Sequence, residues 1–215
     1  DGHRFVEEAI SRGARLVLAQ CKSGRRTSAK QSGASPKGTD DGRPKSAIIE
    51  VNDTRNALAK LAAEFYGRPS SKINVVGVTG TNGKTTVTYL IEALLKKAKK
   101  TPAVIGTVNY RFNGKIIPSK NTTPGPEQLQ SLLADMLSEG VDYAVMEVSS
   151  HALDQQRTES IDFSSAIFTN LTQDHLDYHK TLKNYFAAKA KLFKNIKSGS
   201  FVVINEDDRY GRRLK

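Results

Sequence analysis

The residues best suited to chemistry lie in one stretch, Thr79-Gly80-Thr81-Asn82-Gly83-Lys84-Thr85-Thr86. The apolar run before it predicts a strand, and the residues after it predict a helix. Glycines allow the turn between them to point successive backbone N–H groups inward, toward the positive end of that helix. Lys84 adds a full positive charge, and the hydroxyl of Thr85 can bind Mg²⁺. The stretch therefore predicts a cradle for a nucleotide triphosphate.

One position departs from the general phosphate-loop (P-loop) pattern. That pattern has glycine at the position of Val78, whereas the nearest glycine, Gly77, comes one residue too early. The cradle is therefore a variant of the P-loop, and the misplaced glycine needs an explanation.

Further polar residues follow the later predicted strands where each strand ends. They are Glu147 with Ser149-Ser150-His151, Asn170 with Asp174-His175-Leu176-Asp177-Tyr178-His179, and Asn205 with Asp207 and Asp208. Ligands of open α/β sheets gather beyond the C-terminal ends of the strands. Thr85 and Glu147 supply hard oxygen atoms of the kind that Mg²⁺ prefers, and His175 is a candidate ligand for a second cation. For Asp174 and Asp177, capping of the next helix is the alternative.

The elements that position these residues alternate along the chain. Strands are predicted at 15–19, 47–51, 73–78, 103–105, 108–111, 115–117, 143–148, 164–169 and 201–204. Helices are predicted at 3–13, 54–66, 84–99, 127–139 and 185–196 and from about 207. Such alternation indicates an α/β fold with a doubly wound, mostly parallel sheet. Asn113-Gly114, between two strand-like runs, predicts a hairpin turn.

Two domains are expected, residues 1–72 and 73–215, with the break at Gly67-Arg68-Pro69-Ser70-Ser71. Within the first, residues 22–46 are rich in Ser, Gly and basic residues and predict a flexible basic insertion. Two helices show apolar residues at helical spacing that we expect to face inward. These residues are Leu58, Leu61, Ala62 and Phe65 in the first helix, and Val87, Leu90, Ile91, Leu94 and Leu95 in the second.

Composition narrows the functional classes. The 215 residues carry a net charge of +11, but the basic residues are spread over three places and are not interleaved with stacking aromatic residues, so nucleic acid is not expected as a partner. The sequence has no run long and apolar enough for a membrane span and only one cysteine, which is consistent with a cytoplasmic protein. Because the chain begins with Asp1 rather than Met, we expect a piece of a longer protein.

Seven further motifs follow the cradle in order. They are Asn121-Thr122-Thr123, Met146-Glu147-Val148-Ser149-Ser150-His151, Gln155 with Arg157, Phe168-Thr169-Asn170-Leu171, Asp174-His175-Leu176-Asp177-Tyr178-His179, Ala187-Ala188-Lys189 and Asn205-Glu206-Asp207-Asp208. Together the eight resemble the Mur ligases, ATP-dependent enzymes that build the peptide stem of bacterial peptidoglycan. The resemblance is strongest to the branch that adds meso-diaminopimelate or L-lysine to UDP-N-acetylmuramoyl-L-alanyl-D-glutamate. That family shares the one-residue offset of its P-loop, which accounts for Gly77.

The resemblance implies a role for individual residues. The nucleotide phosphates would be held by Gly80, Thr81, Asn82, Gly83, Lys84, Thr85 and Thr86, and the adenine by Asn205. Thr85 and Glu147 would bind one Mg²⁺, and His175 a second, together with Lys189 modified to a carbamate. Lys84, Glu147, His175 and Lys189 would thus form the catalytic group. The substrate-binding residues would be Asn121, Thr122, Thr123, Ser149, Gln155 and Arg157.

The resemblance also implies an overall arrangement. Residues 1–72 would be part of a domain that binds the UDP-sugar, and a third domain that binds the incoming amino acid would follow residue 215 in the family. We therefore expect the 215-residue chain alone to be inactive, and the enzyme to be a monomer in the bacterial cytoplasm.

Two alternatives stay open at this point. A sister ligase, such as folylpolyglutamate synthase or another stem-residue ligase, would keep the cradle and Glu147 but not the motifs at 121–123, 149–157 and 174–179. A P-loop GTPase would carry a guanine-reading Asn-Lys-x-Asp motif after a later strand, and the sequence has none.

Overall fold

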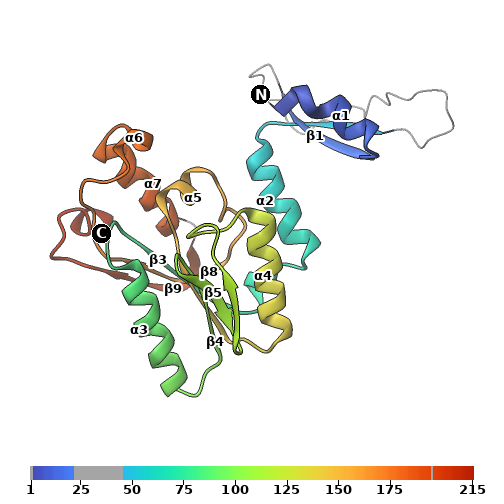
Figure 1. Cartoon of the computed structure of the whole chain (residues 1–215). Helices are drawn as coiled ribbons and strands as arrows, with labels where there is room; N and C mark the ends of the chain where they lie inside the picture. The colour runs from blue at the N-terminus through green and yellow to red at the C-terminus, as the bar shows by residue number, and fades with distance from the viewer. Residues whose placement is uncertain (1, 22–45, 195) are drawn as a thin grey trace. The chain divides into compact units, whose positions relative to one another are not determined.

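The protein is described here by a computed structural model that covers residues 2–21, 46–194 and 196–215 (Figure 1). It divides into two compact units, Asp1–Ala57 and Leu58–Lys215, which we describe separately. Apart from Ser46, the predicted basic insertion at 22–46 lies outside the described residues. No helix of the described part is both long and apolar enough to cross a membrane.

The first unit contains one small parallel sheet. A 3₁₀ turn, η1 (Gly2–Phe5), leads into α1 (Val6–Ser11), so the helix predicted at 3–13 is shorter than expected. β1 (Leu16–Gln20) pairs in parallel with β2 (Ala47–Val51), which confirms both predicted strands. The Asp53 carboxylate accepts hydrogen bonds from the backbone N–H groups of Arg55 (2.8 Å) and Asn56 (3.2 Å) and so caps the next helix.

The helix α2 (Thr54–Phe65) spans the division between the units, and its buried side differs from the prediction. Its buried residues are the small ones Ala59, Ala62 and Ala63, whereas Leu58 and Leu61 are exposed and Phe65 is 84% exposed. Of the four residues expected to face inward, only Ala62 is buried.

The division between the units comes earlier than the boundary near residue 72 that the sequence predicts. The predicted break contains η2 (Pro69–Ser71), and the buried Ser70 accepts a hydrogen bond from the backbone N–H of Asp162 (3.1 Å). The break is therefore fastened to the second unit rather than separating it from the first.

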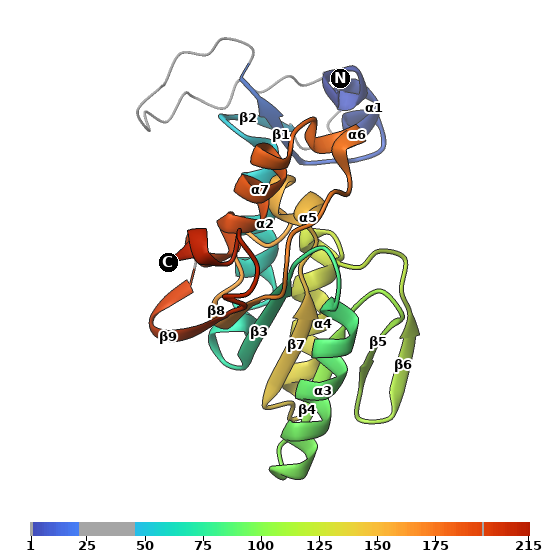
Figure 2. The same cartoon turned by 90° about the vertical axis from the view of Figure 1, so that its left-hand side faces the viewer.

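The second unit is built on a seven-stranded sheet in the order β6-β5-β4-β7-β3-β8-β9 (Figure 2). The strands are β3 (Asn74–Thr79), β4 (Pro102–Ile105), β5 (Asn109–Phe112), β6 (Lys115–Pro118), β7 (Tyr143–Glu147), β8 (Phe163–Phe168) and β9 (Ile196–Ile204). Five of them run parallel, and β5 and β6 form an antiparallel hairpin at one edge. Positive φ angles at Asn113 (45°) and Gly114 (78°) make the predicted hairpin turn. The predicted doubly wound, mostly parallel sheet is confirmed.

Helices cover both faces of this sheet. They are α3 (Lys84–Lys97), α4 (Pro126–Ser138), α5 (Ser150–Asp154), α6 (Leu176–His179) and α7 (Leu182–Lys194). Residues of β3 alternate between the faces: Val75 belongs to the main core with α4 and α7, and Val76 and Val78 pack with α3. Figures 1 and 2 show α3 and α4 on opposite sides of the sheet.

Two details of the second unit differ from the sequence prediction. On α3, Leu90 and Leu94 are exposed, because Val87, Ile91 and Leu95 alone form the side that packs on the sheet. The helix predicted from about 207 is wrong. There, the Asp208 carboxylate accepts hydrogen bonds from the backbone N–H groups of Tyr210 (2.8 Å) and Gly211 (3.0 Å), which makes a turn, and only the 3₁₀ turn η3 (Arg212–Leu214) follows.

Candidate active site

The cradle connects the end of β3 to the start of α3. Gly80 has a φ of 151°, and a Cβ atom on it would lie 1.9 Å from the hydroxyl oxygen of Thr169. Gly83 is the N-cap of α3 with a left-handed φ of 83°. Because α3 begins at Lys84, the unpaired N–H groups of its first turn face the loop, as an anion site requires.

The offset glycine, Gly77, has a packing role. It lies within β3, and a Cβ atom there would be 2.8 Å from the ring of Phe163 and 3.2 Å from Leu192. Val78, which holds the usual glycine position, is fully buried against α3. Gly77 therefore makes room for the core beneath the sheet and is not a phosphate contact.

Lys84 lies across the cradle. Its ammonium group donates hydrogen bonds to the carbonyl oxygens of Gly80 and Thr81, both at 2.9 Å. Burial lowers the pKa of Lys84, while the negative charges of Glu147 and Asp174 oppose that effect. The cation thus lies where phosphate groups would meet the loop.

Glu147 ends β7 beside the cradle and is only 2% exposed. Its carboxylate accepts hydrogen bonds at 3.0 Å from the Thr85 hydroxyl and from both the backbone N–H and the hydroxyl of Thr107. A buried carboxylate bordered by two threonine hydroxyls is a set of hard oxygen donors, which fits a Mg²⁺ ion.

An open cleft of about 250 Å³ brings many of the predicted residues together. It is lined by Thr81, Asn82, Gly83, Lys84, Thr85, Thr86, Thr107, Thr122, Glu147, Ser149 and His175. Residues that end or follow five strands, β3, β4, β6, β7 and β8, thus share one space beyond the C-terminal edge of the sheet.

Lys189 reaches the cradle from α7 and is 1% exposed. Its amine donates a hydrogen bond to the Gly80 carbonyl oxygen (2.7 Å) and lies 4.6 Å from the ring centroid of Tyr185. Burial and the nearby charge of Lys84 lower the pKa of Lys189 to about 7, with Asp174 acting in the opposite sense. An amine that the sequence presents as one of many helical lysines is therefore buried beside the phosphate loop.

Aromatic rings cluster around His175. It precedes α6 in a left-handed conformation (φ 53°), and its ring centroid lies 4.8 Å from that of His151. The Asp174 carboxylate lies 3.4 Å from the His175 ring nitrogen and accepts the His175 backbone N–H, so it does not cap α6. Among the residues that the structure describes, no three His, Cys, Asp or Glu side chains form a metal-binding group.

The predicted substrate-binding residues are connected by hydrogen bonds. The buried Thr123 hydroxyl donates to the Glu147 carbonyl oxygen (2.8 Å) and accepts from the Ser149 N–H (3.0 Å). Arg157 donates to the Thr123 carbonyl oxygen (2.8 Å) and to the Gln155 side-chain oxygen (3.0 and 2.6 Å). Ser149 also caps α5.

The predicted site residues outside the lining of the cleft include Asn121 and Asn205. The Asn121 carbonyl oxygen accepts a hydrogen bond from Tyr110 (2.6 Å). The Asn205 amide donates to the Thr169 carbonyl oxygen (2.8 Å), and the Thr169 hydroxyl donates to the Asn82 carbonyl oxygen (2.6 Å). Asn205 is therefore tied to the cradle through Thr169.

Thr107 is a site residue that the sequence reasoning missed. It follows β4 after Gly106, at the same sheet edge as the other site residues. Thr107 also follows the predicted strand 103–105 by two residues, so the sequence signal for it is the same as for the other site residues, a polar side chain just beyond a strand end.

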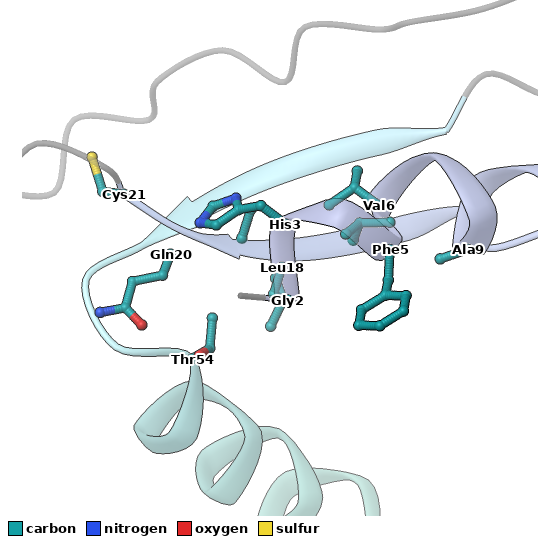
Figure 3. Close-up of a pocket in the computed structure, with 11 residues that line it drawn as sticks. Gly2, His3, Phe5, Val6, Ala9, Leu18, Gln20, Cys21 and Thr54 are labelled. Atoms are coloured by element: carbon teal, nitrogen blue, oxygen red, sulfur yellow. The ribbon is translucent and has the colours of Figure 1, made fainter.

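The first unit has a pocket of its own, of about 860 Å³ (Figure 3). Figure 3 shows His3, Gln20, Cys21 and Thr54 around one end of this pocket, and Phe5 and Val6 toward the other. Its lining mixes apolar side chains with a few polar groups.

Comparison with known proteins identifies the family. The model of the Mur ligase middle domain matches residues 78–215. Relatives from Geobacter sulfurreducens (44% identity) and Aquifex aeolicus (46%), both named UDP-N-acetylmuramoyl-L-alanyl-D-glutamate--2,6-diaminopimelate ligase, align with the whole chain, which spans about 40% of their length. A solved structure of a ligase of that name matches 98% of this chain and 39% of the ligase chain, with a TM-score of 0.75 and 29% identity.

More distant structures share only the fold. A folylpolyglutamate synthase from Mycobacterium tuberculosis has a TM-score of 0.59 at 17% identity over 74% of this chain. With the cradle, the sheet and the family match in agreement, the chain belongs to the Mur ligase family.

Proposed function

We propose that the protein joins the D-glutamate carboxylate of UDP-N-acetylmuramoyl-L-alanyl-D-glutamate to a diamino acid, with conversion of ATP to ADP and phosphate. The names of the relatives favour meso-diaminopimelate over L-lysine as that amino acid. One observation carries the proposal: Lys84, Thr85 and Glu147 share a cleft with Thr122 and Ser149, so the predicted phosphate-binding residues adjoin predicted substrate-binding residues.

The proposed reaction has two steps. The glutamate carboxylate attacks the γ-phosphorus of ATP, which gives an acyl phosphate and ADP. The amine of the incoming amino acid then attacks the acyl carbon, an amide bond forms, and phosphate leaves. Lys84 offsets the negative charge that gathers on the phosphoryl oxygens in the first step, and the cradle N–H groups hold the phosphates in place.

A Mg²⁺ ion fits the oxygen atoms of Thr85 and Glu147. Such an ion would neutralise phosphate charge during phosphoryl transfer. Glu147 is well prepared for this task, because its hydrogen bonds from Thr85 and Thr107 fix the carboxylate before any ligand arrives.

A second cation would need Lys189 as a carbamate together with His175. The neutral amine of Lys189 adds CO₂: a nitrogen–carbon bond forms as one C=O π bond opens, and the nitrogen gives up a proton to solvent. The neutral amine thereby becomes an anionic oxygen ligand. The pKa of about 7 supports this step, because a large share of the amine is neutral at pH 7 to 8. A negative group there would also remove the repulsion between Lys189 and Lys84.

The remaining assignments complete the proposal. Asn205 would contact the adenine, and Asn121, Thr122, Thr123, Ser149, Gln155 and Arg157 would hold the muramoyl dipeptide. The first unit, with its pocket, would take the uridine end of the substrate. The enzyme would act as a cytoplasmic monomer, with no nucleic acid or membrane partner.

The test is a complete reaction with the full-length enzyme. ATP, UDP-N-acetylmuramoyl-L-alanyl-D-glutamate and either diaminopimelate or L-lysine are supplied, and ADP and the tripeptide product are measured. We expect ADP release to require all three substrates and to be faster with diaminopimelate. Lys84→Ala should abolish it, and the control Lys97→Ala, at the far end of α3, should not. Glutamylation of a folate, or ADP release without the dipeptide, would contradict the proposal.

The carbamate is tested at Lys189. Lys189→Ala should lower kcat by at least about 100-fold, and Lys189→Glu should recover part of the loss because it restores an anionic oxygen. Lys183→Ala, an exposed lysine on the same helix, is the control. A ¹³C carbamate signal from labelled bicarbonate should appear in the wild type and be absent from Lys189→Ala. Full turnover by Lys189→Ala would exclude the role.

A further inference from the structure

Tyr178, in α6, lies between two groups of site residues. Its hydroxyl donates a hydrogen bond to the Asp154 carboxylate (3.0 Å) and accepts one from the Gln155 side-chain amide (3.4 Å). Its ring centroid lies 4.3 Å from that of His151 and 4.8 Å from that of His179. The hydroxyl and the ring of one side chain therefore contact different neighbours.

The Tyr178 hydroxyl contacts the predicted dipeptide-binding residues. The Gln155 side-chain oxygen accepts two hydrogen bonds from Arg157, and its amide nitrogen faces the Tyr178 hydroxyl. Arg157 in turn donates to the carbonyl oxygen of Thr123. Contacts at both ends of the Gln155 amide thus fix which way it points, and Tyr178 provides one of them.

The Tyr178 ring is connected, through the His151 ring, to the predicted cation-binding residue His175. The His151 ring, which packs against Tyr178, also meets the His175 ring at 4.8 Å with nearly perpendicular planes (82°). His179, on the same short helix, is held by a contact of 2.9 Å between its ring nitrogen and the Ser150 hydroxyl. Tyr178 therefore supports the ring that packs on His175.

Asp154 anchors this arrangement to α7. Its second carboxylate oxygen accepts a hydrogen bond from the Lys191 ammonium (2.9 Å). Lys191 lies two residues after Lys189, the residue proposed to carry the carbamate. Hydrogen bonds therefore run from α7 through Asp154, Tyr178 and Gln155 to Arg157.

We propose that Tyr178 is a positioning residue that couples the dipeptide-binding residues to the cation-binding residues. Through its hydroxyl it orients Gln155, and with it Arg157, toward the muramoyl dipeptide. Through its ring it holds His151 against His175. The inference rests on the proposed function, since it takes the ligand of each group from there.

Two substitutions separate the two contacts in the full-length enzyme. Tyr178→Phe keeps the ring and removes the hydroxyl, so we expect KM for the UDP-dipeptide to rise about five- to tenfold, as for the loss of one or two hydrogen bonds. KM for ATP and the Mg²⁺ dependence should stay unchanged. Tyr178→Leu removes both contacts, so the Mg²⁺ concentration for half-maximal rate should rise as well. Tyr89→Phe, a partly exposed tyrosine on α3, is the matched control.

Substitutions at Asp154 refine the test. Asn can still accept from Tyr178 through its side-chain oxygen, so Asp154→Asn should resemble the wild type in KM for the dipeptide, whereas Asp154→Ala should resemble Tyr178→Phe. In a double-mutant cycle, Tyr178→Phe should raise KM for the dipeptide little further in the Gln155→Ala background. Both substitutions remove the hydrogen bond between Tyr178 and Gln155, so their effects should not add.

The outcomes distinguish the two proposals. Affinity for the UDP-dipeptide is also measured by calorimetry, which needs no turnover. Unchanged dipeptide affinity in Tyr178→Phe, or equal losses for ATP and dipeptide together with a lower Tm, would overturn the positioning role and leave the proposed function intact. A wild-type enzyme that binds the dipeptide but forms no product would contradict the proposed function alone.

Discussion

Gly106 shows how closely single residues are fitted around the Glu147 carboxylate. A Cβ atom on Gly106 would lie 2.3 Å from a Glu147 carboxylate oxygen. The next residue, Thr107, donates two of the hydrogen bonds that fix that carboxylate. The position of Glu147 therefore depends on the absence of a side chain at Gly106 as much as on the hydrogen bonds to its carboxylate.

The first prediction is that Gly106→Ala weakens the binding of Mg²⁺-ATP about tenfold, because the added methyl group displaces the carboxylate. Binding of ATP in the presence of EDTA should change little. Calorimetry of both titrations provides the measurement. Gly125→Ala is the control, since its Cβ would meet only the flexible carboxylate end of Glu127, at 3.2 Å. Equal losses with and without Mg²⁺ would show that the cradle itself had been distorted.

For single residues, the sequence predicts which residues belong to the candidate site better than it predicts which side chains they contact. Lys84, Thr85 and Glu147 could be found because a glycine-rich turn and a strand end are local patterns. The burial of Lys189 could not be read from its helix, because it depends on how α7 packs on the sheet. Tyr178 lay inside a recognised motif, but its two sets of neighbours come from α5 and from its own helix.

Among the elements, the β5–β6 hairpin is attached to α3 through Arg111. Its guanidinium donates hydrogen bonds to both carboxylate oxygens of Glu92 and lies 4.0 Å from the ring centroid of Tyr89. Glu92 is buried and also accepts from Lys96 (2.8 Å). Burial acts to raise the pKa of Glu92, but the hydrogen bonds from Arg111 and Lys96 outweigh it, and the pKa is lower than usual.

The second prediction concerns Arg111→Ala. It should lower the free energy of unfolding at pH 7 by about 1–2 kcal/mol, because Glu92 stays buried with one partner fewer. The pKa of Glu92 is lower in the folded state than in the unfolded state, so this stabilisation is present above the unfolded value of 4.5 and is lost as pH falls through the folded value. The difference between variant and wild type should therefore shrink in acid.

Urea unfolding at a series of pH values measures this difference. Lys115→Ala is the control, since its ion pair with Glu139 is largely exposed and should contribute little. A pH-independent loss in Arg111→Ala would mean that packing on Tyr89, rather than the ion pair, carries the effect.

The sequence predicted the positions of strands and helices well for a physical reason. Strands of a buried parallel sheet are short apolar runs, and the turns between them contain glycine, proline and asparagine. Which side of a helix is buried was harder to predict. On α2 the buried residues are alanines, and on α3 only some of the apolar side chains pack on the sheet, so spacing alone did not identify the buried side.

For the whole molecule, the two units differ in how much core each contains. The second unit holds three clusters of buried apolar residues. In the described part of the first unit, residues 2–21 and 46–57, Ser46 is the only buried residue. Stability therefore resides in the second unit, because burial of apolar surface is the main favourable term in folding.

The third prediction is that residues 53–215 fold without the rest, whereas residues 1–57 alone do not. The longer piece should show a cooperative thermal transition by circular dichroism, with α2 and its Asp53 cap intact. The shorter piece should give the spectrum of an unfolded chain. Dispersed amide resonances from residues 1–57 alone would contradict this.

Gly77 has a consequence for genetics. Gly77 accommodates the Phe163 ring in the core, whereas Gly80 accommodates Thr169 beside the phosphate loop. Alleles at Gly77 should therefore be temperature-sensitive, because cooling can compensate for a core defect. Alleles at Gly80 should fail at every temperature, because they change the shape of the loop. A screen that sorts mutants by heat sensitivity would thus place Gly77 alleles and Gly80 alleles in different classes, although both glycines belong to the same sequence motif.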